Sequence, residues 1–402
     1  MNNLEQFIYN IVKKVPFIKN SIVSIYQLLL LPFGSKGFKT LNEFTILENQ
    51  YFGFHDKSPF NIDDSIILGF RPPEIYKNIK AIKSGDILIN YGKRWSELKV
   101  IDSTLVWNNV MGPMLHWYDI NNNILIYNST NKNSLIAKLY DVNNNSFFEL
   151  NEPCVHSNSK KGLFCSYNLS DAEKGMKGYG IPDKLNFVQN YKFIVFNKEN
   201  NVLVKLDNND LKSLIDENSS FIWVHHCLFS PNGENIFFMI RWYNKLGERI
   251  SKLFIFNTSK SIITDTKISG MISHLTWVND EEIIVYMNPE FKYGDAFYIY
   301  KLIDKSFIKI NNSYLSDGHP TSLDLNNFIF DTYPNKFREQ FLYFFSINKQ
   351  QKSLVATNNL PFRSKGAYQY DLHPRLSRNK RYISIDCLNN NKLNQIIIDV
   401  KS

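Results

Sequence analysis

The sequence lacks the short motifs that mark the commonest enzyme classes. It contains no Gly-x-Ser-x-Gly turn, no P-loop, no Gly-x-Gly-x-x-Gly after a strand pattern and no His-Glu-x-x-His. These motifs serve, in that order, a serine nucleophile, a triphosphate site, a dinucleotide site and a zinc protease site. Those four classes therefore have no support in the sequence.

Cysteine is scarce, and its spacing carries no metal or disulfide signature. The four cysteines, Cys154, Cys165, Cys227 and Cys387, form no Cys-x-x-Cys pair in the 402 residues. Zinc sites and disulfide frameworks both show closely spaced cysteines. We therefore expect four buried free thiols, as is usual in the reducing cytoplasm.

The chain also lacks a concentrated basic stripe. Its 46 basic and 38 acidic residues leave a net charge of +8, but the lysines are scattered, with no run of five basic residues beyond the N-terminal region. Nucleic-acid binding requires basic residues gathered on one surface. The excess positive charge fits an anionic small ligand or a membrane surface better.

Aromatic residues, in contrast, are abundant. They make up 15% of the chain, with 31 Phe and 22 Tyr, and such residues favour strands over helices. Asparagine clusters such as Asn121-Asn122-Asn123 stand between apolar runs, where they suit turns because Asn tolerates positive φ. The composition therefore predicts a globular chain rich in β-structure.

Residues 1–40 differ in pattern from everything that follows. Lys13, Lys14 and Lys19 stand among apolar residues in an amphipathic segment, and an apolar run extends from Ser21 to Phe33. A helix over that run would rise only about 20 Å, short of the ~30 Å hydrocarbon core of a bilayer. Three alternatives stay open: a helix lying on a membrane or partner, a helix packed on the main domain, and a secretion signal.

From Gln50 onward the chain repeats one pattern, an apolar anchor followed by a turn and a strongly β-type run. Most intervals between anchors fit the about 40 to 50 residues of a propeller blade, and the longest, between His156 and Phe229, needs an insertion. The pattern predicts an all-β fold, a seven-bladed β-propeller over residues 45–402, with an N-terminal helical extension over residues 1–40. The anchors are Phe60, Trp117, His156, Phe229, Trp277, Ser322 and Leu376.

Histidine recurs at one register of this repeat. Three residues before each anchor stand Lys57, Met114, Pro153, His226, His274, His319 and His373, although the chain has only 8 histidines. The repeat symmetry predicts that the four histidines point into a central channel, where imidazoles can share one ion or one substrate. A structural role, with each side chain bonded to the next blade, is the alternative, and we favour such a role for His116, His156 and His225.

Charged residues accompany these histidines. Arg241 lies one β-type run after His226, Asp331 lies at a similar distance after His319, and Asp371 and Arg375 flank His373. An arginine at the channel mouth suits a carboxylate, because the guanidinium group can bind it in a bidentate manner. Salt bridges between blades explain the same residues equally well.

Four stretches resemble a known family. They resemble bacterial β-propeller proteins related to oligogalacturonate lyase, a group often met among surface-polysaccharide functions. The resemblance covers roughly residues 45–400. The stretches are Phe52–Phe60, His226–Gly233 with Arg241-Trp242, Asp317–Pro320 with Asp331–Pro334, and Asp371–Arg375.

The resemblance implies an enzyme that cleaves uronate chains by β-elimination with a divalent, manganese-like metal ion. Such an ion acidifies the C5 proton of the sugar, and a neutral imidazole can remove that proton. The implied metal ligands are His274, His319, His373 and Asp371, with His226 nearest to the role of the base. The predicted catalytic set also includes Arg241, Asp331 and Arg375, and the predicted substrate contacts are Asp56, Lys57, Arg241 and Arg375.

The chain departs from the family in one motif. The lyases carry a Gln-x-x-His-x-His run, whereas Tyr368 and Asp371 stand here at the places of the glutamine and the first histidine. Aspartate is a harder ligand than histidine, so the site can persist with a different preference. We therefore expect an acidic glycan other than a pectin fragment.

Two other functions stay open. One is a non-catalytic glycan-binding or scaffold propeller in polysaccharide biosynthesis, attached to the inner face of the membrane through residues 1–33. The other is a glycosyl-transfer or hydrolytic enzyme that uses carboxylates such as Asp331 and Asp371. In each case we expect a cytoplasmic protein, peripheral at the inner membrane if residues 1–33 bind lipid.

Overall fold

The computed structural model describes residues 25–34, 36–73, 83–132, 134–182, 185, 187–215, 219–310, 315–361, 370–389 and 392–401. Most of the predicted amphipathic extension, residues 1–24, lies outside this range. Residues 25–30 are helical and lead into η1 (Leu31–Phe33). Among the described residues no helix is long and apolar enough to cross a membrane.

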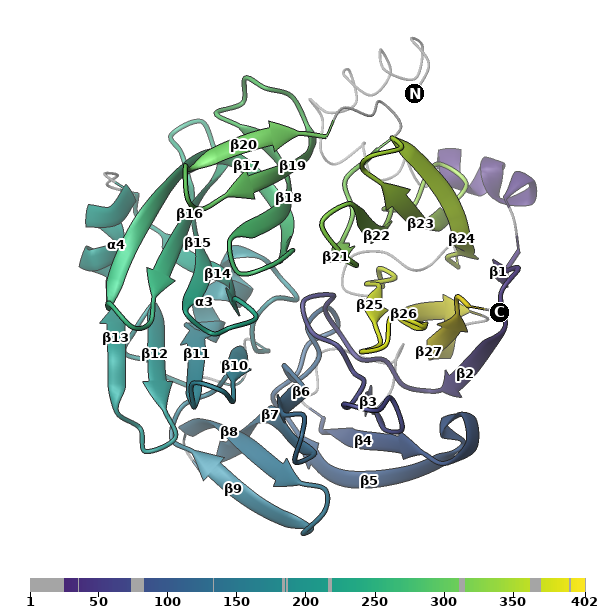
Figure 1. Ribbon diagram of the computed structural model, residues 1–402, viewed down its shortest axis with the longest axis horizontal. Coiled ribbons are helices and arrows are strands. Elements are labelled where there is room, and N and C mark those ends of the chain that lie inside the picture. Colours follow the sequence, from purple (N-terminus) through teal and green to yellow (C-terminus); the bar gives the residue numbers. More distant parts are fainter. Residues whose placement is uncertain are drawn as a thin grey trace.

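The described strands form six sheets, which are arranged radially around a common centre (Figure 1). Strands such as β21 and β25 lie near the centre, and strands such as β5 and β9 lie at the rim. The first three sheets consist of β3 (Ile67–Arg71), β4 (Gly85–Tyr91) and β5 (Glu97–Thr104); of β6 (His116–Asp119), β7 (Ile124–Asn131), β8 (Ser134–Asp141) and β9 (Ser146–Leu150); and of β10 (His156–Asn158), β11 (Leu163–Tyr167), β12 (Phe193–Asn197) and β13 (Val202–Leu206).

The next sheet contains seven strands because one long strand belongs to two arrays. The N-terminal half of β17 pairs with β16, and its C-terminal half, from Gly270 to Trp277, pairs with β18. The outer strand of one array thus continues directly as the inner strand of the next. The strands are β14 (Ile222–Phe229), β15 (Asn235–Tyr243), β16 (Arg249–Asn257), β17 (Ile262–Trp277), β18 (Glu282–Pro289), β19 (Ala296–Lys301) and β20 (Ser306–Lys309).

The last two sheets join the two ends of the chain. An N-terminal strand pairs at the edge of each sheet, with Phe38 opposite Asn358 in one and Phe44 opposite Ile398 in the other. This pairing closes the ring of sheets. The first consists of β21 (Pro320–Ser322), β22 (Asn327–Asp331), β23 (Glu339–Ser346), β24 (Gln351–Asn359) and β1 (Phe38–Thr40), and the second of β25 (Arg375–Leu376), β26 (Tyr382–Asn389), β27 (Lys392–Asp399) and β2 (Phe44–Glu48).

Short helices connect some of these strands. They are η2 (Lys93–Trp95), α3 (Leu169–Gly175) and α4 (Asn208–Ile215). The side chain of Asn168 caps α3 by accepting a hydrogen bond from the Asp171 N–H, which satisfies one of the free donors at a helix start. Both α3 and α4 fall inside the long interval after His156, where the sequence pattern required an insertion.

Two of the anchors predicted from the sequence, Trp117 and Trp277, lie where neighbouring sheets meet. The Trp117 indole donates a hydrogen bond to the Pro59 carbonyl at 2.8 Å, and the Trp277 indole donates one to the Leu228 carbonyl at 3.0 Å. A buried tryptophan N–H usually has such a partner. Each predicted β-type run lies in or overlaps a strand, namely β3, β7, β11, β15, β18, β22 or β26.

The core lies between adjacent sheets. Between β14–β16 and β17–β19, for example, Phe237 stacks on Trp277 with ring centroids 5.6 Å apart. Strands buried on both faces read as continuous apolar runs, and β15 shows such a run from Ile236 to Ile240. All four cysteines are buried and free. The predicted all-β propeller fold is therefore confirmed.

Candidate functional site

The four recurring histidines gather around one aromatic side chain, that of Phe54. The rings of His274 and His319 lie 3.9 Å apart, and those of His319 and His373 lie 4.2 Å apart. The centroid of the Phe54 ring lies 4.8 Å from His226, 6.1 Å from His274, 5.6 Å from His319 and 5.1 Å from His373. The recurrence in the sequence thus corresponds to a single buried cluster.

The backbone is irregular at three of these histidines, His226, His274 and His373. The pairing of β14 with β15 skips His226, which has a φ of 54°, and His373 has a φ of 46° just before β25. The pairing of β17 with β18 likewise skips Ser273 and His274. A bulge turns one side chain out of the alternation of a strand, and non-glycine residues with positive φ concentrate at functional sites. Both observations distinguish these histidines from ordinary strand residues.

A buried ion pair holds Phe54 at the centre. The guanidinium group of Arg375 contacts the Asp386 carboxylate and donates to the carbonyl oxygens of Gly53 and Phe54. Asp386 in turn accepts hydrogen bonds from the N–H groups of Phe52 and Gly53, each at 3.0 Å. Arg375 and Asp386 therefore fix the segment that carries Phe54 and His55. The catalytic and substrate-binding roles predicted for Arg375 stay predictions.

Asp331 orders two of the histidines. Its Oδ1 accepts from the backbone N–H of His319 at 2.7 Å and lies 2.9 Å from the His319 Nδ1, and its Oδ2 accepts from the His373 N–H at 2.9 Å. Burial lowers the pKa of His319, but the carboxylates of Asp331, Asp371 and Asp317 together raise it above its ordinary value. Both Asp331 oxygens are thus engaged, and its predicted catalytic role stays a prediction.

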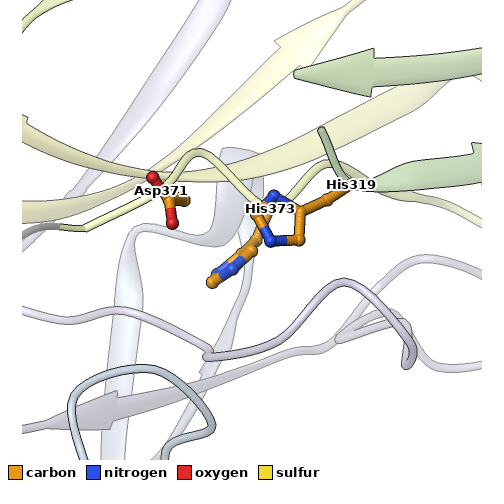
Figure 2. Close-up of side chains that lie close together, drawn as sticks. All are labelled: His319, Asp371 and His373. Carbon is orange, nitrogen blue, oxygen red and sulfur yellow. The ribbon is translucent and has the colours of Figure 1, made fainter. Parts of the chain in front are cut away.

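His319, Asp371 and His373 form a candidate metal centre (Figure 2). Each offers one ligand atom, and these atoms all lie within 4.8 Å of one another. Ligand atoms at about 2.0 to 2.6 Å from one ion span about 4 to 5 Å at most. The Nε2 atoms of His319 and His373 are buried and have no hydrogen-bond partner. An ion would satisfy both atoms, so these residues fit a divalent metal.

The second ring nitrogen of His319 supports the same interpretation. Histidines that bind a metal through one nitrogen usually donate the other N–H to a carboxylate, which fixes the tautomer and the ring orientation. Asp331 is that carboxylate here, at 2.9 Å from the His319 Nδ1. The Nε2 atom is then left as the acceptor for an ion.

His274, which was also predicted as a ligand, has both ring nitrogens near other groups. Its Nδ1 lies 3.3 Å from Asp317 Oδ1 and 3.1 Å from the Ser273 hydroxyl, and its Nε2 lies 3.4 Å from the Tyr333 hydroxyl. The metal group does not include it. Its role as a ligand stays a prediction, although its ring touches that of His319.

His226 belongs to the cluster, and Arg241 lies near it. Burial, and then the neighbouring His225 and Arg241, lower the pKa of His226 well below its usual value, so its imidazole is neutral near pH 7. Arg241 is buried and donates to the Ser251 hydroxyl at 3.2 Å and to the Ile272 carbonyl at 2.9 Å. Burial, and then Arg249, lower the pKa of Arg241 to about 9. The roles predicted for His226 and Arg241 stay predictions.

Comparison with known proteins supports the fold. No protein-family model and no curated sequence matches the chain, whereas solved structures do. An oligogalacturonate lyase in complex with manganese has a TM-score of 0.60 and 11% identity, over 91% of this chain and 98% of the lyase. One from Vibrio parahaemolyticus has a TM-score of 0.57 and 11% identity, over 90% and 98%. The chain has the fold of the oligogalacturonate lyases.

A more distant similarity extends to another propeller. The β-propeller domain of the trilobed protease from Pyrococcus furiosus has a TM-score of 0.50 and 12% identity, over 84% of this chain and 92% of that domain. That domain is described as having an open velcro topology. In the present chain β2 pairs with β27, so the sheet containing the C-terminal strands is completed by an N-terminal strand, as in a closed ring.

A series of hydrogen bonds between buried side chains leads to Asp371. The side-chain amide of Gln340 donates to the Tyr370 carbonyl at 2.9 Å and to Asp371 Oδ1 at 3.4 Å. Asn358 donates to the Gln340 amide oxygen at 3.2 Å, and Cys387 donates to the Asn358 oxygen at 3.0 Å. Tyr368, which stands at the place of the glutamine in the family motif, lies outside the described residues. The structure thus provides Gln340 as the amide beside Asp371.

The predicted substrate contacts Asp56 and Lys57 are paired with each other. The Lys57 ammonium lies 2.8 Å from both Asp56 oxygens, and both side chains are buried. They follow His55 in the chain. Their predicted contact with a saccharide stays a prediction.

Sequence reasoning missed His55 and Phe54 as members of the cluster. His55 Nδ1 lies 2.9 Å from the Pro320 carbonyl, its Nε2 is buried without a partner, and its ring lies 5.2 Å from that of His319. The repeat register indicated Lys57 instead. The only available signal was the Phe52–Phe60 stretch itself, which carries part of the family resemblance.

Proposed function

We propose that this protein is a metal-dependent, lyase-like propeller that acts on an acidic, uronate-type saccharide. The observation that carries the proposal is the juxtaposition at one centre of the His319–Asp371–His373 group, a neutral His226 and a buried arginine, Arg241. The fold shared with oligogalacturonate lyases, one of them in complex with manganese, supports it. A divalent, manganese-like cofactor is part of the proposal.

The residues of the site would have separate roles in a β-elimination. A bound divalent ion would supply Lewis-acid polarisation of the uronate carboxylate. Arg241 would bind and orient that carboxylate through its guanidinium group. The neutral His226 imidazole would remove the C5 proton, the electron pair of the C5–H bond would become the C4–C5 double bond, and the C4–O bond would break, with the departing oxygen taking a proton from water.

We also propose that the propeller has seven blades. We count the seven-stranded sheet as two blades because β17 serves as the outer strand of one array and the inner strand of the next. With the other five sheets this makes seven blades, which form a domain over residues 45–402. The β1 pairing with β24 shows that part of the preceding segment also contributes a strand.

We further propose that residues 1–33 contact the inner face of the membrane of a bacterial cell and that the protein is otherwise cytoplasmic. Leu28, Leu29 and Phe33 are 53%, 67% and 76% exposed, which favours a contact that covers them. A role in surface-polysaccharide metabolism would follow from this location. Flotation of the protein with anionic vesicles, compared with a variant lacking residues 1–33, tests the contact.

Elemental analysis combined with an activity assay tests the enzymatic proposal. The purified protein should hold near-stoichiometric metal, and the His319→Ala/His373→Ala variant should lose it. Uronate oligosaccharides should yield ultraviolet-absorbing unsaturated products, and a chelator should abolish this reaction. A matched control is the His116→Gln/His156→Gln variant, because these histidines stack on each other with ring centroids 5.4 Å apart and are absent from the metal group.

The same assay separates the other functions. If the protein takes up no manganese, zinc or calcium, the metal-dependent lyase is excluded. Turnover that survives chelation and is lost in Asp331→Asn or Asp371→Asn would then indicate a glycosyl-transfer or hydrolytic enzyme. Saccharide binding without turnover would indicate a glycan-binding or scaffold propeller.

A further inference from the structure

Two arginines flank the sulfur atom of one methionine at the edge of the histidine cluster. Arg241 Nη1 lies 2.6 Å and Arg249 Nη1 lies 3.2 Å from the Met176 Sδ. Arg241 comes from β15, Arg249 begins the neighbouring β16, and Met176 directly follows α3. The Arg241 Nη2 also donates to the carbonyl of Ile272, two residues before His274. The three side chains therefore adjoin the candidate site.

Neither arginine is paired with a carboxylate among the described residues. Among the described residues the side-chain hydrogen bonds of Arg241 go to the Ser251 hydroxyl, the Ile272 carbonyl and two methionine sulfurs, and that of Arg249, which is exposed, goes to the Met176 sulfur. Arg241 is only 1% exposed. A buried charge without a counter-charge is costly, so the fold retains at this point an arginine that an anionic ligand would stabilise.

The thioether of Met176 is a poor partner for two cations. A methionine sulfur is a weak hydrogen-bond acceptor, whereas a carboxylate forms short, charge-assisted bonds with guanidinium groups. A ligand carboxylate at the position of the sulfur would therefore be bound more strongly than the sulfur itself.

The backbone at Met176 is fixed, but its side chain can move. The Met176 N–H donates to the Ala172 carbonyl at 2.8 Å, and the preceding Gly175 packs against Trp223 so closely that a Cβ atom would lie 2.4 Å from the indole. The methionine side chain itself is unbranched and has three rotatable bonds. A ligand can displace the sulfur without moving α3.

We propose that Met176 occupies the place of a ligand carboxylate and that Arg241 and Arg249 clamp this carboxylate when the Met176 side chain swings aside. The inference rests on the proposed function, because the carboxylate is taken to belong to the acidic saccharide. It adds Arg249 as a second binding residue. It also makes Met176 a side chain that the ligand carboxylate displaces. The ligand class is a sugar acid, because neither arginine has a carboxylate partner among the described residues.

Binding measurements on three variants test the clamp without requiring turnover. Calorimetric titration with galacturonate, in the presence of chelator so that no metal contributes, should show binding that galactose does not show. Arg249→Gln should weaken galacturonate binding roughly ten- to hundredfold, the usual effect of losing one charge-assisted bond. Met176→Leu, which keeps the volume and removes the sulfur acceptor, should tighten it roughly three- to tenfold.

Lys245→Gln is the matched control, because it removes one positive charge from the exposed turn between β15 and β16. It should leave the affinity within about twofold, because Lys245 has no hydrogen bond to Met176 among the described residues, whereas Arg249, which is also exposed, has one. Circular dichroism and thermal unfolding should show that all three variants fold like the parent. If Lys245→Gln weakens binding as much as Arg249→Gln does, the effect is one of net charge and the clamp is refuted.

Further outcomes of these measurements bear on the clamp, on the carboxylate assignment and on the lyase activity. Unchanged affinity in Arg249→Gln or in Met176→Leu would refute the clamp even if the protein proved to be a lyase. Sulfate bound more tightly than galacturonate would refute the carboxylate assignment. Galacturonate binding with the expected variant effects, but without any unsaturated product, would establish the clamp and refute the lyase.

Discussion

The carboxylate of Asp331 holds His319 through both its backbone and its ring. The same oxygen lies 2.7 Å from the backbone nitrogen of His319 and 2.9 Å from its Nδ1. The other oxygen accepts from the backbone of His373. One buried residue thus sets the positions of both histidines in the candidate metal centre, which makes it a sensitive point for testing that centre.

Asp331→Asn should weaken manganese binding about 10- to 100-fold, as loss of a carboxylate behind a metal-bound histidine usually does. The amide offers one acceptor oxygen where three donors converge, so the protein should also lose about 1 to 3 kcal/mol of unfolding free energy. Isothermal titration with manganese and urea unfolding measure the two effects. Asp324→Asn, at an exposed turn of the same sheet, is the control and should change neither. Unaltered affinity in Asp331→Asn would exclude His319 as a ligand.

Gln340→Leu should disturb Asp371. The substitution leaves the Asn358 amide without its acceptor and removes the donor to the Tyr370 carbonyl and to Asp371. We expect a loss of about 1 to 3 kcal/mol in urea unfolding, because the groups left behind are buried. Manganese affinity should also fall. Gln351→Leu, on the exposed start of β24, should stay within about 0.5 kcal/mol of the parent. Full manganese affinity in Gln340→Leu would show that Asp371 needs no support from Gln340.

Arg375→Met should be among the most destabilising single substitutions in the chain. It leaves the buried Asp386 carboxylate without its counter-charge, which typically costs about 3 to 5 kcal/mol. Arg94→Met is the matched control, because the Arg94–Glu43 pair is 66% and 62% exposed and such pairs contribute at most about 1 kcal/mol. Chemical denaturation of both variants gives the comparison. Equal losses of unfolding free energy in the two variants would show that the buried Arg375–Asp386 pair does not fix the segment that carries Phe54.

The stability of the protein should fall as the pH falls below about 6. Burial, and then Lys57, lower the pKa of His116 to about 3, whereas the imidazole of an unfolded chain titrates near about 6.5. Between these values the unfolded state binds more protons than the folded one, so unfolding free energy decreases with decreasing pH. His116 alone contributes a slope of about 1.4 kcal/mol per pH unit. Buried histidines whose pKa is also lowered, such as His156 and His226, add to this slope, whereas His319, whose pKa is raised, opposes it.

Urea unfolding at pH 6 and pH 5 measures that slope. In His116→Gln it should be smaller than in the parent by about 1.4 kcal/mol per pH unit, even though the variant is less stable at both values. The His116 ring donates to the Met114 carbonyl and accepts from the Ser157 hydroxyl, each at 2.8 Å, so glutamine retains hydrogen-bonding capacity there. An identical slope in parent and variant would mean that His116 is not held neutral by the fold.

The strands and the main histidines could be predicted from the sequence because their signals are local. Apolar anchors such as Trp117 and Trp277, each followed by a turn and a β-type run, located strands in every sheet. The register of His226, His274, His319 and His373 predicted their convergence, because equivalent positions of a radial repeat face the same centre. The seven-stranded sheet could not be foreseen, since the continuity of β17 depends on its pairing with strands on both sides.

By itself the sequence determined which residues form strands, where the turns fall and which histidines share a register, because alternation and turn chemistry act over a few residues. Only the tertiary structure decided that Phe54 and His55 enter the histidine cluster, that Gln340 supports Asp371, and that Met176 lies between Arg241 and Arg249. These contacts join segments far apart in the chain, such as residues 54 and 375. They depend on how the sheets pack around the centre, and no local pattern encodes that packing.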